Sequence, residues 1–149
     1  MKRVQYFALF LIVIAFVSCV SSKGTTTLSN GTDITKYKYI LFGKEDDGDA
    51  ELADILMMVQ NELSEKLTVV SDAKAIQLIA QGEYVLSPQI NVKTEKWGGG
   101  HTYISISFYD ADTNQNVAVV KSSGIGLSIS HDQQLAFKAI KKELDKVFK

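Results

Sequence analysis

The strongest constraint on the fold is a run of alternating residues in the second half of the chain. Apolar and polar side chains alternate one by one over 84–94 and again over 102–110. A period of two is typical of a strand with one buried and one solvated face. With a turn at 112–115 and a third strand at 117–126, the pattern predicts an antiparallel meander. Pro88 lacks a backbone donor, which predicts an edge or a bulge in the first of these strands.

Helices and short strands are predicted before the meander. The run 37–42 is apolar and rich in β-forming residues, which favours an internal strand. Over 51–67, apolar residues recur at three- and four-residue spacing, as in an amphipathic helix. A short strand at 67–70 and a second helix capped by Ser71 or Asp72 follow it.

A last helix is predicted after the meander. Ser130 and Gln133 have the spacing of a capping box, and they precede an apolar face at helical spacing that includes Phe137, Ile140 and Leu144. The element order over 36–149 is then β-α-β-α-β-β-β-α. We expect one α+β domain with a mixed sheet that ends in the antiparallel meander, with the helices packed on one face.

The amino terminus is organised like a secretory signal. Two basic residues precede an apolar run of about a dozen residues, 6–17, which is short for a membrane span. The run ends in Ser18 and Cys19, so the only cysteine follows a small residue, as in the bacterial lipobox. This resemblance implies that 1–18 is a cleaved lipoprotein signal peptide. It also implies that Cys19 carries acyl chains such as palmitate, which hold the protein on the membrane.

The residues around the lipobox set further expectations. An uncleaved signal anchor is the alternative, because the uncharged stretch from Val4 to Ser22 could span a bilayer. Val20 is not the aspartate of an inner-membrane retention signal, and by analogy we expect an outer-membrane lipoprotein that faces the periplasm. Residues 19–35 are rich in Ser, Thr, Gly and Asn, which predicts a lipidated flexible tether before a domain at 36–149.

Composition excludes several classes of function. A net charge of -1 does not suit a broadly basic nucleic-acid binder, so no nucleic-acid partner is expected. One cysteine and two histidines do not make a standard four-ligand zinc site, and no motif points to a cofactor. The acidic run 45–51 offers calcium oxygens, but its spacing does not fit an EF-hand, and a solvated helix start explains it equally well.

No catalytic residue is predicted. Ser130, His131 and Asp132 have the residue types of a catalytic triad. Adjacent residues at a helix start do not point at one another, however, and no nucleophile elbow accompanies them. We therefore expect a protein that is not an enzyme and has no metal site.

Two segments carry a resemblance to known proteins. They are Gly82-Glu83-Tyr84-Val85-Leu86-Ser87 and the hairpin that runs from Asp110 to Val117. Together with the element order, they resemble a group of bacterial envelope lipoprotein domains. That group includes the TolB amino-terminal domain, the CsgG-like secretion lipoproteins and the penicillin-binding-protein activators. Asn114 stands where those proteins carry a turn glycine. The resemblance implies a fold and a compartment, and it transfers no site residue.

The candidate binding surface combines a loop and a strand face. Trp97 lies in a glycine-rich loop before His101, and an exposed tryptophan is a good binding anchor. Tyr103 and Tyr109 fall on the polar face of the strand that follows, where tyrosine and serine make adaptable contacts. A plain hairpin loop and a solvated or helix-covered sheet face are the alternatives. We expect a non-enzymatic protein-binding or accessory lipoprotein whose partner is an envelope protein. The alternatives are an activator or assembly factor for a cell-wall enzyme and a secretion-associated lipoprotein.

Overall fold

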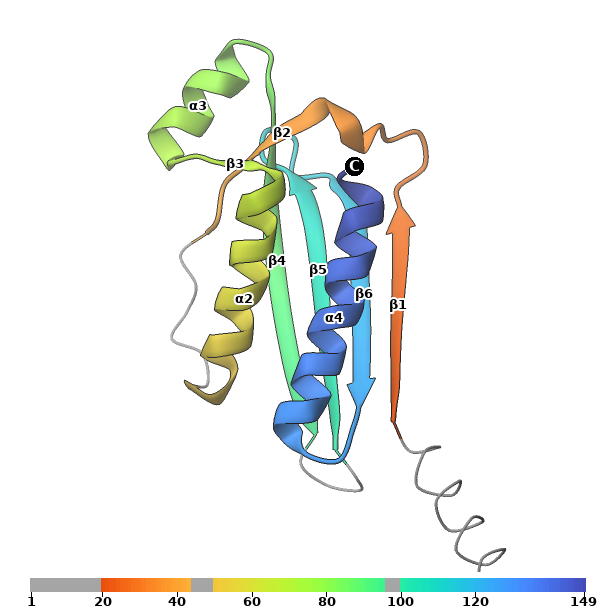
Figure 1. The fold of residues 1–149 in the computed structure, drawn as a ribbon. Coiled ribbons are helices and arrows are strands. Elements are labelled where there is room, and N and C mark those ends of the chain that lie inside the picture. Colours follow the sequence, from red (N-terminus) through yellow and green to blue (C-terminus); the bar gives the residue numbers. More distant parts are fainter. Residues whose placement is uncertain (1–19, 44–49, 96–99) are drawn as a thin grey trace, which may run out of the picture.

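The computed structural model of the chain describes residues 20–43, 50–95 and 100–149, which form one mixed sheet with helices packed on it (Figure 1). The strands are β1 (Ser21–Leu28), β2 (Tyr37–Ile40), β3 (Thr68–Val69), β4 (Tyr84–Glu95), β5 (His101–Asp110) and β6 (Asn116–Ile125). The helices are η1 (Ile34–Lys36), α2 (Ala50–Lys66), α3 (Asp72–Ala80) and α4 (Ile129–Val147). The predicted α+β class is confirmed.

The strand order across the sheet is β1-β6-β5-β4-β2-β3. β4, β5 and β6 form the predicted antiparallel meander. β2 lies parallel to both β3 and β4, and parallel neighbours need crossover connections, which α2 and α3 supply. β2 pairs with β4 only as far as Leu86, so Pro88 lies where that side of β4 is open and its missing donor costs no ladder bond.

The main core lies between the sheet and two helices. α2 and α4 lie side by side across one face (Figure 1). Ile104, Ile106 and Phe108 of β5 are fully buried beneath them, together with Leu63 of α2 and Ile140 of α4. Alternation along a strand turns Val85 to the opposite side from its neighbour Leu86. There Val85 forms a small second cluster with Ala75 and Leu78 of α3, at one end of the sheet.

The prediction of a flexible tether is wrong for Ser21–Leu28, because these residues form β1. The strand pairs with β6 along its whole length, from Ser21 opposite Ile125 to Leu28 opposite Ala118. The Thr26 hydroxyl donates to the Glu143 carboxylate of α4 at 2.8 Å, which fixes the strand to the helix as well. The small and β-branched residues that suggested a linker also suit an edge strand, and an available neighbour decides between the two.

The last helix begins earlier than predicted. Ser128, not Ser130, is the N-cap, and its hydroxyl accepts from the backbone N–H of His131 at 3.3 Å. The buried Asp132 in the first turn accepts from the backbone N–H of Gly126. This bond draws the strand end against the helix start, so the turn closes one serine earlier than the capping-box pattern suggested.

A buried carboxylate organises the β5–β6 turn. Asp110 accepts from the Tyr37 hydroxyl at 2.7 Å and from the backbone N–H of Thr113 at 2.9 Å. Burial raises the pKa of Asp110, but the bonds from Thr113 and Tyr37 outweigh it and hold that pKa below its ordinary value. Burial and the bond to Asp110 raise the pKa of Tyr37. Asn114 has a φ of 55° in this turn, a left-handed conformation that asparagine tolerates better than most residues.

We expect Gly124→Ala to destabilise the fold, because α4 crosses β6 at this glycine. An added Cβ would lie 2.3 Å from the Asp132 carbonyl oxygen and 2.5 Å from the Ala136 amide nitrogen. Overpacking of this kind costs about 1–3 kcal/mol of unfolding free energy, measurable by urea denaturation. Gly43→Ala is the control, since nothing lies within 4 Å of its added Cβ. Equal effects of the two changes would contradict this account of the contact.

We expect Asp110 to make stability depend on pH in the acid range. Its folded pKa lies below its unfolded value of about 3.9, so its contribution is complete above the unfolded value. The contribution is lost as pH falls through the folded pKa. Urea midpoints measured from pH 6 to pH 2 should therefore fall less in Asp110→Asn than in the wild type. The exposed neighbour Asp112, changed to Asn, should follow the wild-type profile.

Candidate binding surface

The sheet face opposite α2 and α4 presents the polar residues of four neighbouring strands. Register carries the polar side of β5 across the sheet, since Tyr103 is opposite Lys93 of β4 and Ser123 of β6. Ser123 is opposite Lys23 of β1 in turn. We call this surface the open face. Its members are Ser87, Gln89, Asn91, Lys93, Tyr103, Ser105, Ser107, Tyr109, Val119, Lys121, Ser123, Lys23, Thr25 and Thr27.

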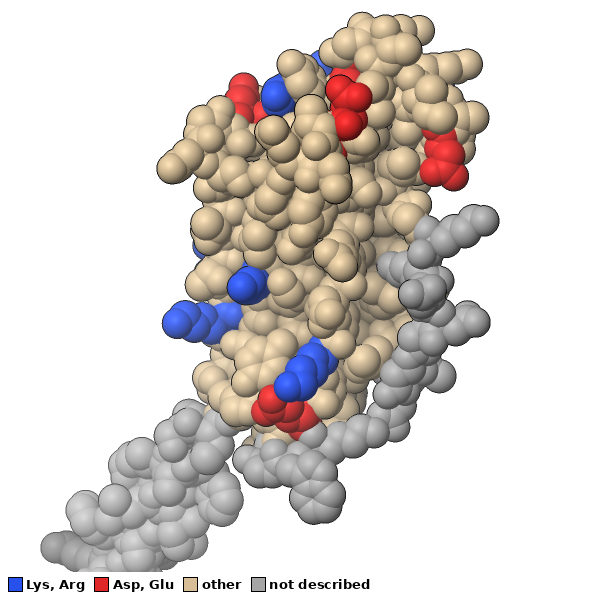
Figure 2. Space-filling model, turned by 180° about the vertical axis from the view of Figure 1, so that it is seen from behind, with Lys and Arg blue, Asp and Glu red and all other residues tan. Residues whose placement is uncertain are grey.

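The open face is broad and carries little charge. Figure 2 shows it as a surface of mostly uncharged side chains with a few lysines and one acidic group toward its lower end. The lysines are Lys23, Lys93 and Lys121, and Glu95 at the end of β4 pairs with Lys93 at 3.2 Å. Among the described elements, only α3 packs near this side, at the end of β4. Hydroxyl and amide groups across such a surface can donate and accept hydrogen bonds to a partner.

The structure brings together two of the four residues predicted for binding. His101 and Tyr103 lie side by side with their ring centroids 5.6 Å apart and their planes at 27°, and Tyr103 is 40% exposed. Tyr109 shares the face but lies six residues further along β5, at a strand rise of about 3.4 Å per residue, or about 20 Å away. Trp97 and Cys19 lie outside the described residues.

Sequence patterns missed much of this surface. The face residues of β1 fell in the segment interpreted as a tether, although its run of threonines is a strand signal. The polar side of β4 is visible as alternation, and β6 is predicted as the third strand of the same meander. Their place beside Tyr103 depends on the strand pairing, which alternation alone does not specify.

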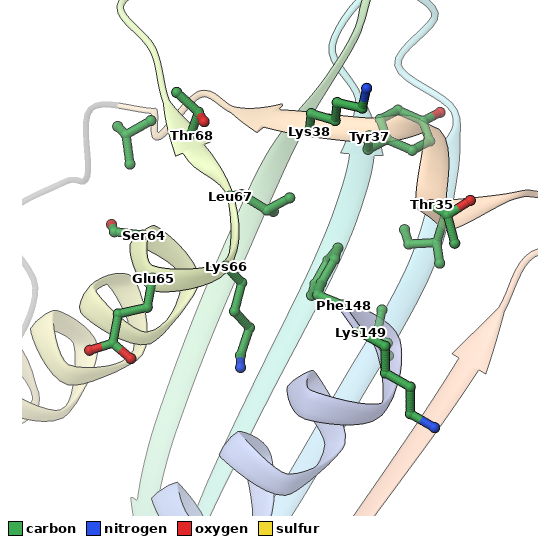
Figure 3. Close-up of a pocket in the computed structure, with 13 residues that line it drawn as sticks. Thr35, Tyr37, Lys38, Ser64, Glu65, Lys66, Leu67, Thr68, Phe148 and Lys149 are labelled. Atoms are coloured by element: carbon green, nitrogen blue, oxygen red, sulfur yellow. The ribbon is translucent and has the colours of Figure 1, made fainter.

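A groove lies elsewhere on the molecule, beside the ends of the two long helices. This groove of about 900 Å³ separates η1 and β2 from the carboxyl ends of α2 and α4, with Leu67 and Phe148 inside it (Figure 3). Its Lys66 is paired with Asp145 and, at 3.1 Å, with Glu62. Burial alone lowers the pKa of Lys66, but the bonds that its ammonium donates to these two carboxylates outweigh burial and raise the pKa. The charge of this lysine is therefore compensated within the fold, and its side chain bridges the two helices.

The residues considered for catalysis and metal binding have structural roles where they are described. The Nδ1 atom of His131 accepts from the Leu127 N–H at 3.3 Å, and Asp132 binds the Gly126 N–H, so Ser130, His131 and Asp132 form no relay. The other oxygen of Asp132 is buried without a partner. Within the described ranges, no group of His, Cys, Asp and Glu side chains could hold a metal ion. Of the acidic run 45–51, residues 45–49 lie outside those ranges.

The part of the chain that the structure describes contains no helix that is long and apolar enough to cross a bilayer.

Comparison with known proteins identifies fold neighbours and no family. No protein-family model and no curated protein matches the chain. The PelC dodecamer from Paraburkholderia phytofirmans has a similar solved structure, with 16% identity, a TM-score of 0.52, and coverage of 86% of this chain and 98% of that one. A point variant of the same protein gives 15% identity, a TM-score of 0.51, and coverage of 86% and 99%. A PDZ domain protein from Parabacteroides distasonis gives 11% identity and a TM-score of 0.48, with 87% of this chain and 37% of that one covered. The two PelC likenesses show that the chain shares its fold with a protein of very different sequence.

Proposed function

We propose that this chain is a lipid-anchored, non-enzymatic accessory protein of the bacterial envelope, which binds another envelope component through its open face. The observation that carries the proposal is the polar face itself, four strands wide, which no described helix covers along β5, with Tyr103 and Tyr109 toward either end of that strand. Flat sheet faces with tyrosine, serine and amide side chains suit contact with a macromolecule better than enclosure of a small substrate.

The proposed anchor and compartment rest on the amino terminus. The apolar run 6–17 followed by Ser18 and Cys19 has the order of a lipoprotein signal. Several acyl chains on Cys19 would hold the protein firmly, because one chain alone gives only marginal binding. Val20 after the cysteine favours the outer membrane, with the domain in the periplasm.

Three of the four buried carboxylates in the described ranges hold parts of the fold together, which supports binding rather than catalysis. Asp110 holds a turn, Glu143 holds β1 through Thr26, and Glu62 joins the two long helices through Lys66 and Lys141. Each of these carboxylates is occupied by partners within the fold. None is left poised in an open pocket, where a catalytic acid or base would be needed.

Self-assembly is a second candidate, since a protein with this fold was solved as a dodecamer. The outer edge of β1 and the side of β4 beyond Leu86 have no strand neighbour among the described elements. Open strand edges are places where another chain can add. A secretion-associated assembly would fit such contacts, whereas an activator of a cell-wall enzyme would need only the open face.

We expect the anchor to depend on one residue. Mature protein from cells should carry an amino-terminal Cys19 whose mass shows the attached acyl chains. Cys19→Ser should abolish that modification, since no other cysteine is present. The variant should no longer be recovered as acylated protein in the membrane fraction. An unmodified Cys19 with residues 1–18 still attached would contradict lipidation and favour the signal anchor.

We expect the open face to contact the partner in cells. A photo-crosslinking amino acid placed at Tyr103 or at Tyr109 should capture the same envelope component. The same group at Met57, which is exposed on the helical side, should not capture it. Tyr103→Ser should weaken capture from position 109 while changing the unfolding free energy by less than about 0.5 kcal/mol, as surface changes do. Capture of a second copy of the chain would favour self-assembly, and equal capture from Met57 would contradict a role for this face.

A further inference from the structure

One end of the sheet carries exposed apolar side chains that the proposed partner surface does not use. Leu127 is 75% exposed, the most of any large apolar residue described, and Val20 and Ile129 are each 39% exposed. We call these three residues the apolar end. Single exposed apolar residues are ordinary on protein surfaces. These three need an explanation because strand pairing gathers them at one place.

The pairing of β1 with β6 brings the apolar end together. Ser21 lies opposite Ile125, so the chain before β1 lies beside the turn that follows β6. That turn contains Leu127 and leads into Ile129, the first residue of α4. In Figure 1 the start of β1 and the β6–α4 turn lie at the same end of the sheet, the end away from α3.

The turn holds Leu127 outward in a fixed position. Two backbone N–H groups are engaged here, since that of Gly126 donates to Asp132 and that of Leu127 itself donates to His131 Nδ1 at 3.3 Å. The Ser128 hydroxyl caps the helix directly after it. Three local bonds therefore fix the backbone that exposes this leucine, and its exposure is not a consequence of a loose loop.

A row of two lysines, a tyrosine and a serine crosses the sheet next to the apolar end. Lys23, Ser123, Tyr103 and Lys93 are opposite one another across β1, β6, β5 and β4. This row is two residues, or about 7 Å, behind the pair Ser21 and Ile125. Tyrosine and lysine are favoured at the headgroup level of a membrane, next to apolar groups that reach deeper. Lys93 also pairs with Glu95, so Lys23 is the less compensated of the two cations.

The chain before β1 identifies the surface that the apolar end meets. Only Val20 separates Cys19 from the first residue of β1, so an anchor at Cys19 leaves no tether. An extended residue spans at most about 3.6 Å, which places the bilayer surface against this end of the sheet. The same holds for an uncleaved anchor, because the apolar run 6–17 ends before the same strand.

We propose that the apolar end inserts into the headgroup region of a lipid bilayer and sets the sheet upright on it, with Lys23 and Tyr103 at the interface. The proposal rests on the membrane attachment proposed above, and it adds a second, non-covalent contact with the lipid. The ten-residue strands then project from the membrane, and the β5–β6 turn lies about 30 Å from it.

Depth-dependent quenching tests this orientation. Mature full-length protein with Leu127→Cys, labelled with the fluorophore NBD, would be reconstituted into vesicles of phosphatidylethanolamine and phosphatidylglycerol. Emission should shift to the blue and be quenched by lipids that carry a nitroxide in the headgroup region. Ile76→Cys is the matched control, since it is 68% exposed on α3 at the other end and should show neither effect.

A charge at the apolar end should remove the effect without unfolding the protein. Ile129→Asp in the Leu127→Cys protein should reduce the quenching at least severalfold, and an acidic residue in the first turn of α4 suits the helix dipole. No quenching at 127, or equal quenching at 127 and 76, would overturn the proposal. Quenching at 127 that is unchanged by Ile129→Asp would overturn it as well. The proposal would also fail if the emission at 127 shifted to the blue only when the protein dimerised without lipid.

The same samples separate this proposal from the lipid anchor. Acylated Cys19 has no free thiol, so the wild type should not take up the fluorophore. Labelling of the wild type by the fluorophore would refute lipidation. Quenching at positions 127 and 76 would then be measured in proteins that also carry Cys19→Ser. Quenching at 127 but not at 76 in those proteins would support insertion of the apolar end, while the acyl anchor would stay refuted.

Discussion

The pairing of β1 with β6 determines how this domain relates to whatever its amino terminus is attached to. Eight consecutive residue pairs join the two strands, and the Thr26 hydroxyl adds a bond to Glu143 on α4. The Lys146 ammonium beside Glu143 holds the pKa of that carboxylate below its ordinary value, so the acceptor stays charged. Because β1 begins at Ser21, the chain is held in the sheet from that residue on.

The close approach of α4 to the sheet makes that pairing possible. β1 and β6 can lie under the helix only because the sheet positions nearest to it have no side chain. An added Cβ would lie 2.6 Å from Glu143 at Gly24 and 2.3 Å from the Asp132 carbonyl at Gly124. The Ser122 hydroxyl uses the same proximity to donate to the Ala136 carbonyl at 2.8 Å. Small residues on two strands thus produce one seam, on which the edge strand and the helix start both depend.

The sequence patterns predict most of the elements and the antiparallel meander, but not the strands that pair with the meander on either side. Alternation over 84–94 and 102–110 and helical spacing over 51–67 specify burial directly, and the structure has a strand or a helix in each place. β1 has no apolar alternation because its inner side meets a helix through glycine and a hydrogen-bonded threonine. Ser128 caps α4 in preference to Ser130 because Asp132 binds Gly126, which is a contact between two elements. The binding residues were predicted only along β5, and the extension of the open face onto β1 depends on a pairing that the sequence patterns do not indicate.

The open face and the apolar end are connected through β5. Tyr103 lies in the row next to the apolar end, and Tyr109 lies at the other end of the same strand, about 20 Å further on. A sheet that stands on its apolar end would therefore present a surface graded from the lipid headgroups outward. A partner on that surface would meet Lys23 and Tyr103 near the membrane, and Ser107 and Tyr109 beyond them. Such an arrangement fits a partner that is itself membrane-associated, because both partners would be held at the same height and need to find each other in only two dimensions.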